Sequence, residues 1–346
     1  MQIVGELKDQ SIIIKKPKDV GRLYNKSRIG TPLKENKLKL TLLEGLFLLG
    51  ENKIKIYKNK KEIETEQLIQ QASEKIPAFE TIYLAYKDLR NRGQTIRQSN
   101  EKVIDLETCK LHTKEKQSNI IIFSERDILD FSKITKIAKT IKNKNLWFSI
   151  VDEEGDITYY DVALTNLKGK TTESKYPTST GFLLENRILI FNEPLKNDLL
   201  EKEFYGKPFG ELLQLSLVEA LYLVEKNILN IKHMKNKKDL SKTDFINHIQ
   251  KLQPDIENRL TVFRDLKKRG LIVKTGFKFG SHFRAYTKKP DETHAEYLVH
   301  VIPKNYMCSC AELSRAVRLA HSVNKEIVFA QTSDKIDYIK FGRLRP

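Results

Sequence analysis

The segment Gly5-Glu-Leu-Lys-Asp-Gln-Ser-Ile-Ile-Ile14 has a counterpart in Gly181-Phe-Leu-Leu-Glu-Asn-Arg-Ile-Leu-Ile190, 176 positions further along the chain. Each copy begins with glycine, passes through polar residues and ends in a short Ile-rich run, which predicts a β-strand. A match at a long fixed spacing indicates a duplicated structural unit.

Four more landmarks recur in the same order, at spacings between 175 and 182. They are Gly30-Thr-Pro32 with Gly206-Lys-Pro208, Leu40–Glu44 with Leu215–Glu219, Asp88–Gly93 with Asp265–Gly270, and Asp130–Lys133 with Glu312–Arg315. This order predicts a tandem duplication of one unit of about 170 residues. The polar segment 167–180 is typical of a linker, so we expect a first unit at 1–166 and a second at 181–346.

Both helices and strands are expected in each unit. Apolar residues at helical spacing follow possible caps at Thr41 and Ser216, which predicts helices over 41–49 and 216–225. In the second unit we expect a helix at 256–268, strands at 271–275, 277–279, 296–302 and 326–330, and a final strand near 338–341. The predicted fold class is α/β of the mixed α+β kind. Each unit would have a small helical and strand-containing N-terminal subdomain and a nuclease-like C-terminal α/β subdomain.

The composition indicates a soluble protein that binds polyanions. Sixty-two Lys and Arg against 45 Asp and Glu give a formal net charge of +17, which favours binding to RNA, DNA or an acidic lipid surface. No apolar run approaches the ~18 residues of a membrane span, and the first twenty residues lack a signal-peptide core. We therefore expect a cytoplasmic protein with no membrane partner.

The cysteines indicate a reducing compartment. Cys109, Cys308 and Cys310 form an odd, sparse set, unlike a disulfide framework. Cys308 and Cys310 lack a second His or Cys pair to complete a zinc site. No metal site is expected.

One predicted helix separates an apolar arc from a cationic one. Over 312–323, helical spacing places the apolar side chains on one side and Arg315, Arg318 and Ser322 on the other. Lys325 follows at the start of a strand. Among the histidines, His282 and His300 are expected to be packed structural residues, whereas His294 lies in a polar turn before a strand, and the sequence alone leaves its role open.

Three runs of the second unit carry a family resemblance. They are Arg264-Asp-Leu-Lys-Lys-Arg-Gly…Val273-Lys-Thr-Gly-Phe-Lys-Phe-Gly-Ser-His-Phe-Arg-Ala-Tyr286, His294-Ala-Glu-Tyr-Leu-Val-His300 and Leu313-Ser-Arg-Ala-Val-Arg-Leu-Ala-His-Ser-Val-Asn-Lys325. Together they closely resemble the archaeal tRNA-splicing endonucleases. The repeat extends the resemblance to the duplicated, homodimeric type of this family.

The resemblance implies an activity and its residues. The family cuts precursor tRNA at both intron boundaries of a bulge-helix-bulge motif, and its catalytic Tyr, His and Lys match Tyr286, His294 and Lys325. Two arginines that clamp a flipped bulge base match Arg318 and, less closely, Arg343. RNA cleavage by the adjacent 2′-hydroxyl needs a base, an acid and a cation. The implied roles are Tyr286 as base, His294 as acid and Lys325 on the phosphorane, giving 2′,3′-cyclic phosphate and 5′-hydroxyl ends without a metal or small-molecule cofactor.

The first unit is expected to be degenerate and non-catalytic. The place of His294 would fall at Gln117 or Ser118, and that of Lys325 at Asn143 or Lys144. The first unit instead carries an acidic turn, consisting of Asp152, Glu153, Glu154 and Asp156. In related enzymes such a turn enters a basic cleft on a partner chain, which implies a homodimer.

Two other interpretations remain open on the sequence. The chain could be a non-catalytic, basic RNA-binding or scaffold subunit of an RNA-processing complex. It could also be a metal-dependent DNA nuclease, since Asp291, Glu292 and Glu296 are acidic, although the expected Glu-x-Lys element is missing. A cleavage assay in EDTA separates these interpretations.

Overall fold

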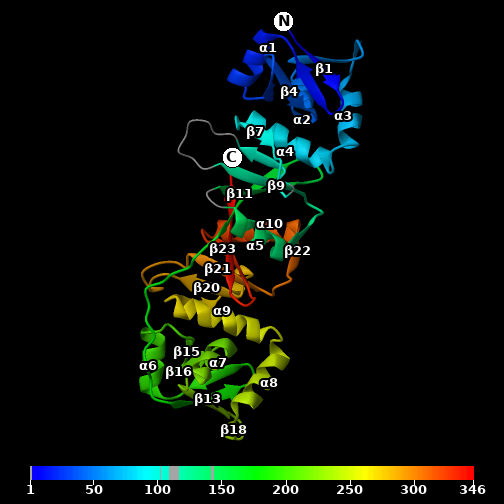
Figure 1. Cartoon of the computed structure of the whole chain (residues 1–346). Helices are drawn as coiled ribbons and strands as arrows, with labels where there is room; N and C mark the ends of the chain where they lie inside the picture. The colour runs from blue at the N-terminus through cyan, green and yellow to red at the C-terminus, as the bar shows by residue number, and fades with distance from the viewer. Residues whose placement is uncertain (1, 102, 109–116, 142–143) are drawn as a thin grey trace.

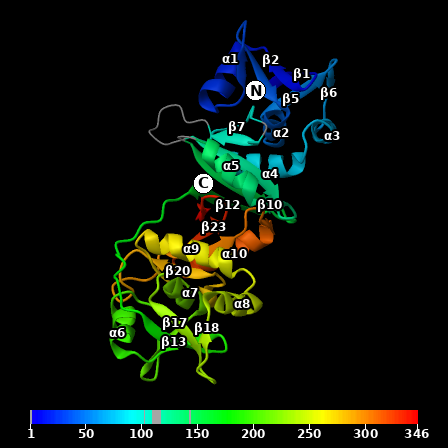
Figure 2. The ribbon, with the colours of Figure 1, turned by 60° about the horizontal axis from the view of Figure 1, so that its bottom comes forward.

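The computed structural model describes residues 2–101, 103–108, 117–141 and 144–346. In this part of the chain, two small six-stranded sheets lie at the ends of the molecule and a ten-stranded sheet lies between them (Figure 1). The C-terminus lies in the middle of the molecule, which is also visible in Figure 2. None of the described helices is both long and apolar enough to cross a membrane.

The two small sheets have the same topology. Their strand orders are β3-β4-β2-β1-β5-β6 and β15-β16-β14-β13-β17-β18. The first consists of β1 (Ile3–Lys8), β2 (Ser11–Ile14), β3 (Thr31–Leu33), β4 (Lys37–Thr41), β5 (Ile54–Lys58) and β6 (Lys61–Glu62); the second consists of β13 (Ser179–Leu184), β14 (Arg187–Ile190), β15 (Lys207–Phe209), β16 (Leu212–Leu215), β17 (Leu229–His233) and β18 (Asp239–Leu240). The predicted duplication is therefore confirmed in three dimensions.

Helices cover each small sheet. In the first unit these are α1 (Pro17–Gly21), which continues into a π-helical segment (Arg22–Lys26), α2 (Leu42–Gly50) and α3 (Thr65–Ser73). The second unit has α6 (Glu193–Glu201), α7 (Leu217–Glu225) and α8 (Lys242–Leu252). The two predicted capped helices are α2 and α7, and both begin with a capping box.

The repeated glycines have a packing reason. A Cβ atom on Gly5 would lie 2.5 Å from Ile12 Cγ2, and one on Gly181 would lie 2.8 Å from Ile188 Cγ2. Both distances are shorter than carbon atoms allow, so only glycine lets the facing isoleucine pack on the first strand. The same residue is therefore required at the same place in both units.

The repeated glutamates have a hydrogen-bonding reason. The Glu44 carboxylate accepts from the backbone amides of Thr41 and Gly30, each at 2.8 Å. In the second unit the Glu219 carboxylate accepts from the amides of Ser216 and Gly206, each at 2.9 Å. Each glutamate caps its own helix and also fixes the turn that carries the repeated glycine.

The remaining strands form the central sheet, in the order β19-β20-β21-β23-β24-β12-β11-β9-β8-β7. Their bounds are β7 (Ile96–Gln98), β8 (Leu106–Thr108), β9 (Ser118–Ser124), β11 (Asn145–Val151), β12 (Ile157–Leu164), β19 (Ile272–Thr275), β20 (Phe283–Tyr286), β21 (Tyr297–Ile302), β23 (Glu326–Gln331) and β24 (Asp337–Leu344). Antiparallel pairing of β12 with β24, from Tyr159↔Leu344 to Leu164↔Ile339, joins the two units. A short ladder of β10 (Ile128–Asp130) with β22 (Met307–Ser309) adds a second connection.

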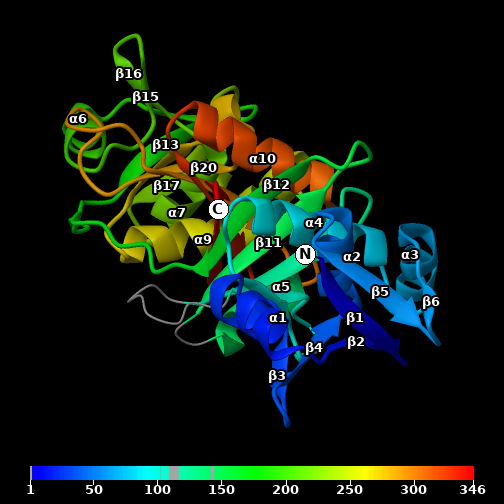
Figure 3. The same cartoon turned by 90° about the horizontal axis from the view of Figure 1, so that it is seen from above.

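Two pairs of helices cover opposite faces of this sheet. The helices α4 (Phe79–Asn91) and α9 (Ile256–Lys268) pack on one face, and α5 (Phe131–Thr140) and α10 (Cys310–Ser322) pack on the other. Figure 3 shows α10 and α5 from above. On α10, Leu313, Val317 and Ala320 are buried while Arg315 and Arg318 are exposed, as the helical spacing predicts.

His282 and His300 pack together at 4.6 Å between ring centroids, and Cys308 and Cys310 are buried; Cys109 lies outside the described residues.

The predicted strand at 277–279 is wrong. Phe277–Phe279 forms one turn of 3₁₀ helix, labelled η2. The Gly276 amide donates to His282 O at 3.0 Å, and Gly280 has a φ of +61°. These two glycines close a tight turn between β19 and β20, so the chain reverses where the alternation of residues indicated an extended segment.

The expected linker is ordered against α9. The Gly169 amide donates to Arg269 O at 2.9 Å, and the Thr171 amide donates to Gly270 O at 3.0 Å. A Cβ on Gly169 would lie 1.9 Å from Gly270 O. Strand β13 begins at Ser179, inside the segment expected to be linker.

Candidate active site

Strand register places Tyr286 and Lys325 on one face of the central sheet. Ala285 pairs with Tyr297, and Tyr297 pairs with Glu326. One step further along these ladders, Tyr286, Glu296 and Lys325 lie in one row across β20, β21 and the start of β23. Paired residues on adjacent strands point to the same face, about 5 Å apart per strand. Tyr286 and Lys325 are therefore on the α10 face, about 10 Å apart between Cα atoms.

The ring of Phe279 connects the surroundings of these two residues. The Lys325 Nζ lies 5.6 Å from the centre of this ring, and the Arg284 guanidinium lies 5.7 Å from it. Arg284 in turn lies 5.9 Å from the centre of the Tyr286 ring. The chain Tyr286–Arg284–Phe279–Lys325 is thus continuous. Arg284 and Phe279 were not among the predicted site residues, although both lie within the Gly-Phe-Lys-Phe-Gly…Phe-Arg-Ala-Tyr run.

Tyr286 and Lys325 differ in burial. The Tyr286 side chain is 7% exposed and packs with Ile272, Ala295 and the partly buried Phe204. Lys325 is half-buried, and its Nζ donates to Val323 O at 3.3 Å. The tyrosine is therefore held by packing, whereas the lysine amine keeps access to solvent.

His294 lies in the loop between β20 and β21. Its side chain is exposed, next to the buried Ala295 that contacts Tyr286. The Glu296 carboxylate closes this loop, because it accepts from the Thr287 amide at 3.0 Å and from Thr287 Oγ1 at 2.6 Å. The structure therefore brings His294 to the same end of the sheet as Tyr286 and Lys325, on the loop rather than in the row.

Arg318 and Arg343 both lie near Tyr160. Arg343 on β24 pairs directly with Tyr160 on β12. When the β23–β24 ladder is continued by two residues beyond the pair Ile327↔Phe341, Arg343 lies next to Lys325, in the same row. Burial raises the pKa of Tyr160, and the charges of Arg318 and Arg343 act in the opposite direction, so both groups lie near the phenol. The Tyr160 hydroxyl donates to Ser314 Oγ on α10 at 2.9 Å. Lys340 lies on the opposite face, paired with Glu326 at 3.0 Å.

The equivalent row of the first unit is only partly preserved. In the first unit Asn145 pairs with Ser118, and in the second unit Glu326 pairs with Tyr297. If these two pairs are equivalent, the preceding residues correspond as well. Lys144 then takes the place of Lys325, and Gln117 takes the place of Glu296. The replacement of His294 by Gln117 or Ser118 stays a prediction, because His294 lies in a loop outside the paired strands. Asn143 lies outside the described residues.

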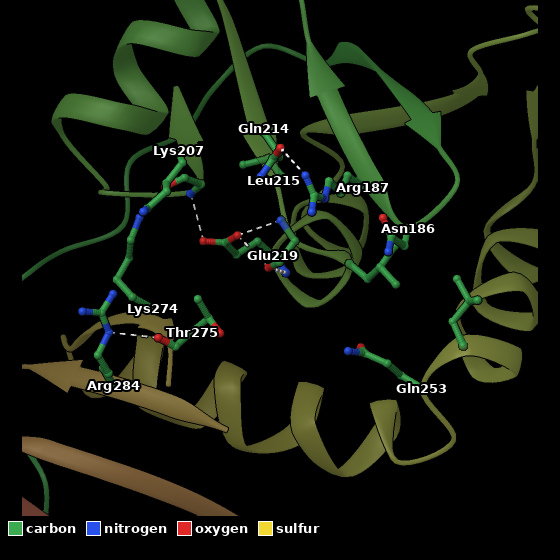
Figure 4. A pocket seen from close by; sticks show the side chains of 14 residues that line it. Asn186, Arg187, Lys207, Gln214, Leu215, Glu219, Gln253, Lys274, Thr275 and Arg284 are labelled. Atoms are coloured by element: carbon green, nitrogen blue, oxygen red, sulfur yellow. Dashed lines mark hydrogen bonds between the residues drawn. The ribbon is translucent and has the colours of Figure 1, made fainter. Parts of the chain in front are cut away.

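A basic pocket lies between the two subdomains of the second unit (Figure 4), and one of its lining residues, Arg284, lies 5.9 Å from the centre of the Tyr286 ring. Its volume is about 380 Å³, and its lining has four basic residues and one acidic one. Arg187 and Lys207 come from the small sheet, and Lys274 and Arg284 come from the central one. The acid, Glu219, is already occupied by the hydrogen bonds of its cap. The pocket is therefore suited to an anionic group.

The acidic turn joins β11 to β12. Asp152 Oδ1 accepts from the amides of Glu154 and Asp156 at 3.0 and 2.8 Å, which fixes the turn. All four carboxylates are exposed, and Glu153 is paired with Arg126. Among the described residues, no group of three or more His, Cys, Asp or Glu side chains is placed to hold a metal ion.

Comparison with known proteins identifies both parts of each unit. The family described as "tRNA intron endonuclease, N-terminal domain" matches residues 3–69 and 179–246. The family described as "tRNA intron endonuclease, catalytic C-terminal domain" matches residues 79–159 and 256–340. The matches account for most of the chain, and each family matches twice.

Two curated relatives match this chain over nearly its full length. The tRNA-splicing endonuclease of Methanococcoides burtonii is 37% identical, covering 98% of this chain and 98% of the relative. That of Methanosarcina barkeri is 33% identical, covering 98% and 99%. A shorter tRNA-splicing endonuclease from Methanothermobacter thermautotrophicus is 41% identical and covers 42% of this chain but 85% of itself. The chain is an endonuclease that belongs to the tRNA intron endonuclease family.

Proposed function

We propose that this endonuclease acts on precursor tRNA and cuts it at both intron boundaries within a bulge-helix-bulge motif. The family membership supports the substrate, and the full-length relatives are named tRNA-splicing endonucleases. The observation that carries the site assignment is the row that places Tyr286 and Lys325 on one face, with His294 on the loop at the same end. Because this substrate is an RNA of the cell interior, we also propose a cytoplasmic location.

The proposed reaction is an attack by the 2′-oxygen on the adjacent phosphorus. The 2′-hydroxyl gives its proton to Tyr286 as a bond forms from the 2′-oxygen to phosphorus. The bond from phosphorus to the 5′-oxygen then breaks, and His294 gives a proton to that oxygen. The products are a 2′,3′-cyclic phosphate and a 5′-hydroxyl, with no gain or loss of electrons.

Cations at the site support these roles. Charge develops on the non-bridging oxygens in the transition state, and the Lys325 ammonium is the proposed partner for that charge. A phenol accepts a proton as phenolate, which nearby cations stabilise, and the Arg284 guanidinium lies 5.9 Å from the Tyr286 ring. Side chains supply the base, the acid and the cation, so we propose that no metal ion takes part. The division between Tyr286 as base and His294 as acid rests on the family resemblance.

Arg318 and Arg343 are proposed to hold an extruded bulge base. Planar guanidinium groups stack on nucleobases, and a flipped base can be held between two of them. The nearness of both arginines to Tyr160 supports the pairing. Recognition by extruded bases and backbone shape depends little on the sequence of the intron.

We propose a homodimer in which the acidic turn of one copy enters the basic pocket of the other. Asp152, Glu153, Glu154 and Asp156 are exposed on a fixed turn, and the pocket has four basic residues and one acid that is already satisfied. Opposite charges on preformed surfaces favour this pairing and fix its register. A twofold dimer would carry two catalytic units, one for each bulge, and the first unit of each chain would serve assembly rather than catalysis.

Analytical ultracentrifugation tests the dimer. Changing the four acids of the turn to Asn or Gln should raise the dissociation constant of the dimer by at least about tenfold. Arg187→Gln with Lys207→Gln should have a similar effect from the other side. A control variant with three other exposed acids of the first unit, Glu66, Glu74 and Glu80, changed to Gln should dimerise normally. A dimer of unaltered affinity in the acidic-turn variant would reject this interface.

A cleavage assay tests the proposed activity. Purified protein is incubated with a bulge-helix-bulge transcript in EDTA, and the product ends are mapped. Two cuts with cyclic phosphate and 5′-hydroxyl ends support the proposal. Activity that returns only after Mg²⁺ is added, or 5′-phosphate ends, would contradict it.

A further inference from the structure

An exposed aromatic side chain projects from the turn between β19 and β20. Phe277 is 87% exposed, more than any other large hydrophobic residue in the described part of the chain. Free phenylalanine surface in water is unfavourable, so an aromatic this exposed often marks a contact surface.

The turn that carries Phe277 is rigid. The Phe279 amide donates to Gly276 O at 2.8 Å, and the Gly280 amide donates to Phe277 O at 3.1 Å. Ser281 Oγ donates to Phe283 O at 3.2 Å, below the turn. A Cβ on Gly276 would lie 2.2 Å from Ser281 Oγ and 2.9 Å from Phe283 O, so this close approach requires glycine. The exposed ring is thus presented on a preorganised support, which lowers the entropy cost of binding.

The turn also borders the candidate active site. Phe279, two residues from Phe277, contacts both the Lys325 Nζ and the Arg284 guanidinium. The turn that carries Phe277 is therefore packed against Lys325, the residue proposed to contact the scissile phosphate. This continuity connects the exposed ring to the reaction rather than to a distant surface.

The charges around Phe277 favour a nucleotide. Lys278 is exposed, and among the described residues no carboxylate lies within ion-pair distance of it. Arg284 and Lys325 lie against Phe279 of the same turn, so the exposed ring projects from a basic region. Proteins that bind single-stranded RNA combine aromatic platforms for bases with cations for the backbone in this way. An apolar protein partner would instead have to cover these charges.

We propose that the turn 276–280 binds a nucleotide next to the scissile phosphate, with an unpaired base stacked on Phe277 and the neighbouring phosphate paired with Lys278. The proposal rests on the proposed RNA substrate and adds two residues to its binding site. Stacking on a phenylalanine face discriminates little between bases. The contact would thus serve affinity and placement of the strand rather than sequence recognition.

Equilibrium binding tests this contact without cleavage. The probe is a bulge-helix-bulge RNA with 2′-deoxynucleotides at both scissile positions and 2-aminopurine in one bulge. Phe277→Ala should raise the Kd by about tenfold and reduce the change in 2-aminopurine fluorescence, whereas Phe277→Trp should retain both. Phe191→Ala, which removes another exposed phenylalanine, 46% exposed and packed on Phe182, is the matched control and should bind normally.

Salt dependence tests the lysine. Lys278→Ala should lower the slope of log Kd against log salt by about one unit, as loss of one phosphate contact requires. An unchanged slope would overturn this half of the proposal. An unchanged Kd for Phe277→Ala would overturn the proposed stacking of a base on Phe277. A variant that weakens the dimer but binds RNA normally would overturn it as well. Cleavage by the wild-type protein is measured separately, so failure of this contact is distinguishable from failure of the proposed function.

Discussion

Removing the Lys325 amine should slow cleavage strongly while leaving the fold intact. At an effective dielectric constant of 20, an ammonium about 4 Å from a phosphorane oxygen stabilises it by about 4 kcal/mol. Lys325 is half-buried, so solvent screens part of this electrostatic stabilisation. We therefore expect Lys325→Ala to raise the activation free energy of cleavage by about 2.7 kcal/mol, which is roughly 100-fold in rate. Its hydrogen bond to Val323 O, at 3.3 Å, is long, so Lys325→Ala should change the free energy of unfolding by about 1 kcal/mol or less.

Single-turnover cleavage at saturating enzyme measures this effect on the chemical step. Lys340→Ala is the matched control, because it removes the same charge from the adjacent strand but on the opposite face of the sheet, where Lys340 pairs with Glu326. We expect the control to cut at nearly the wild-type rate. If Lys325→Ala cuts at a rate within threefold of wild type, the role proposed for Lys325 in the transition state is refuted.

Three further outcomes are expected. His294→Ala should lower the single-turnover rate about 100-fold with RNA affinity nearly unchanged, as loss of a general acid predicts; an unchanged rate would remove His294 from the site. Burial lowers the pKa of His282 to about 4 in the folded protein. The imidazole therefore gains its proton at a higher pH in the unfolded chain, and the free energy of unfolding should fall as the pH drops from about 6.5 to 4. Urea titrations should show a shallower fall for His282→Gln, and an equal fall would contradict the contribution of His282. Gly181→Ala should destabilise by about 1–3 kcal/mol because its Cβ would lie 2.8 Å from Ile188, whereas Gly342→Ala, with no atom within 4 Å, should be tolerated; equal stability of the two variants would reject the packing argument.

The duplication could be predicted from the sequence because its landmarks each perform a local task. The repeated glycines make room for a facing isoleucine, and the repeated glutamates cap a helix and fix a turn. The Asp88–Gly93 and Asp265–Gly270 landmarks end α4 and α9, and both aspartates accept a hydrogen bond from a tyrosine, Tyr159 or Tyr338. Local requirements of this kind leave a recognisable pattern of residues.

The joining of both units into one sheet could not be predicted in the same way. The sequence predicts a final strand near 338–341, but not which strand it pairs with, because any half-buried edge offers the same hydrogen-bonding groups. The turn at Phe277–Phe279 was missed for a related reason. Its two phenylalanines alternate like a strand, and only the close approach of Gly276 to Ser281 shows that the chain must reverse.

The candidate site was predictable in its residue types but not in its surroundings. Tyr286, His294 and Lys325 came from the family resemblance, and nothing in their spacing along the chain indicates that β20, β21 and β23 are neighbours. The contacts of Phe279 with Lys325 and Arg284 depend on that neighbourhood. So does the position of Arg343 beside Tyr160, which distinguishes it from Lys340 on the other face.

Replacing one nucleotide tests the central chemical claim most directly. A bulge-helix-bulge transcript is made with a 2′-deoxynucleotide on the 5′ side of one scissile phosphate, and both bonds are followed in EDTA. If the 2′-oxygen is the nucleophile, the deoxy bond should remain whole while the other bond is cut and ends in a cyclic phosphate. Cleavage of the deoxy bond at a comparable rate would show that water or another group attacks, and the roles proposed for Tyr286, His294 and Lys325 would not stand.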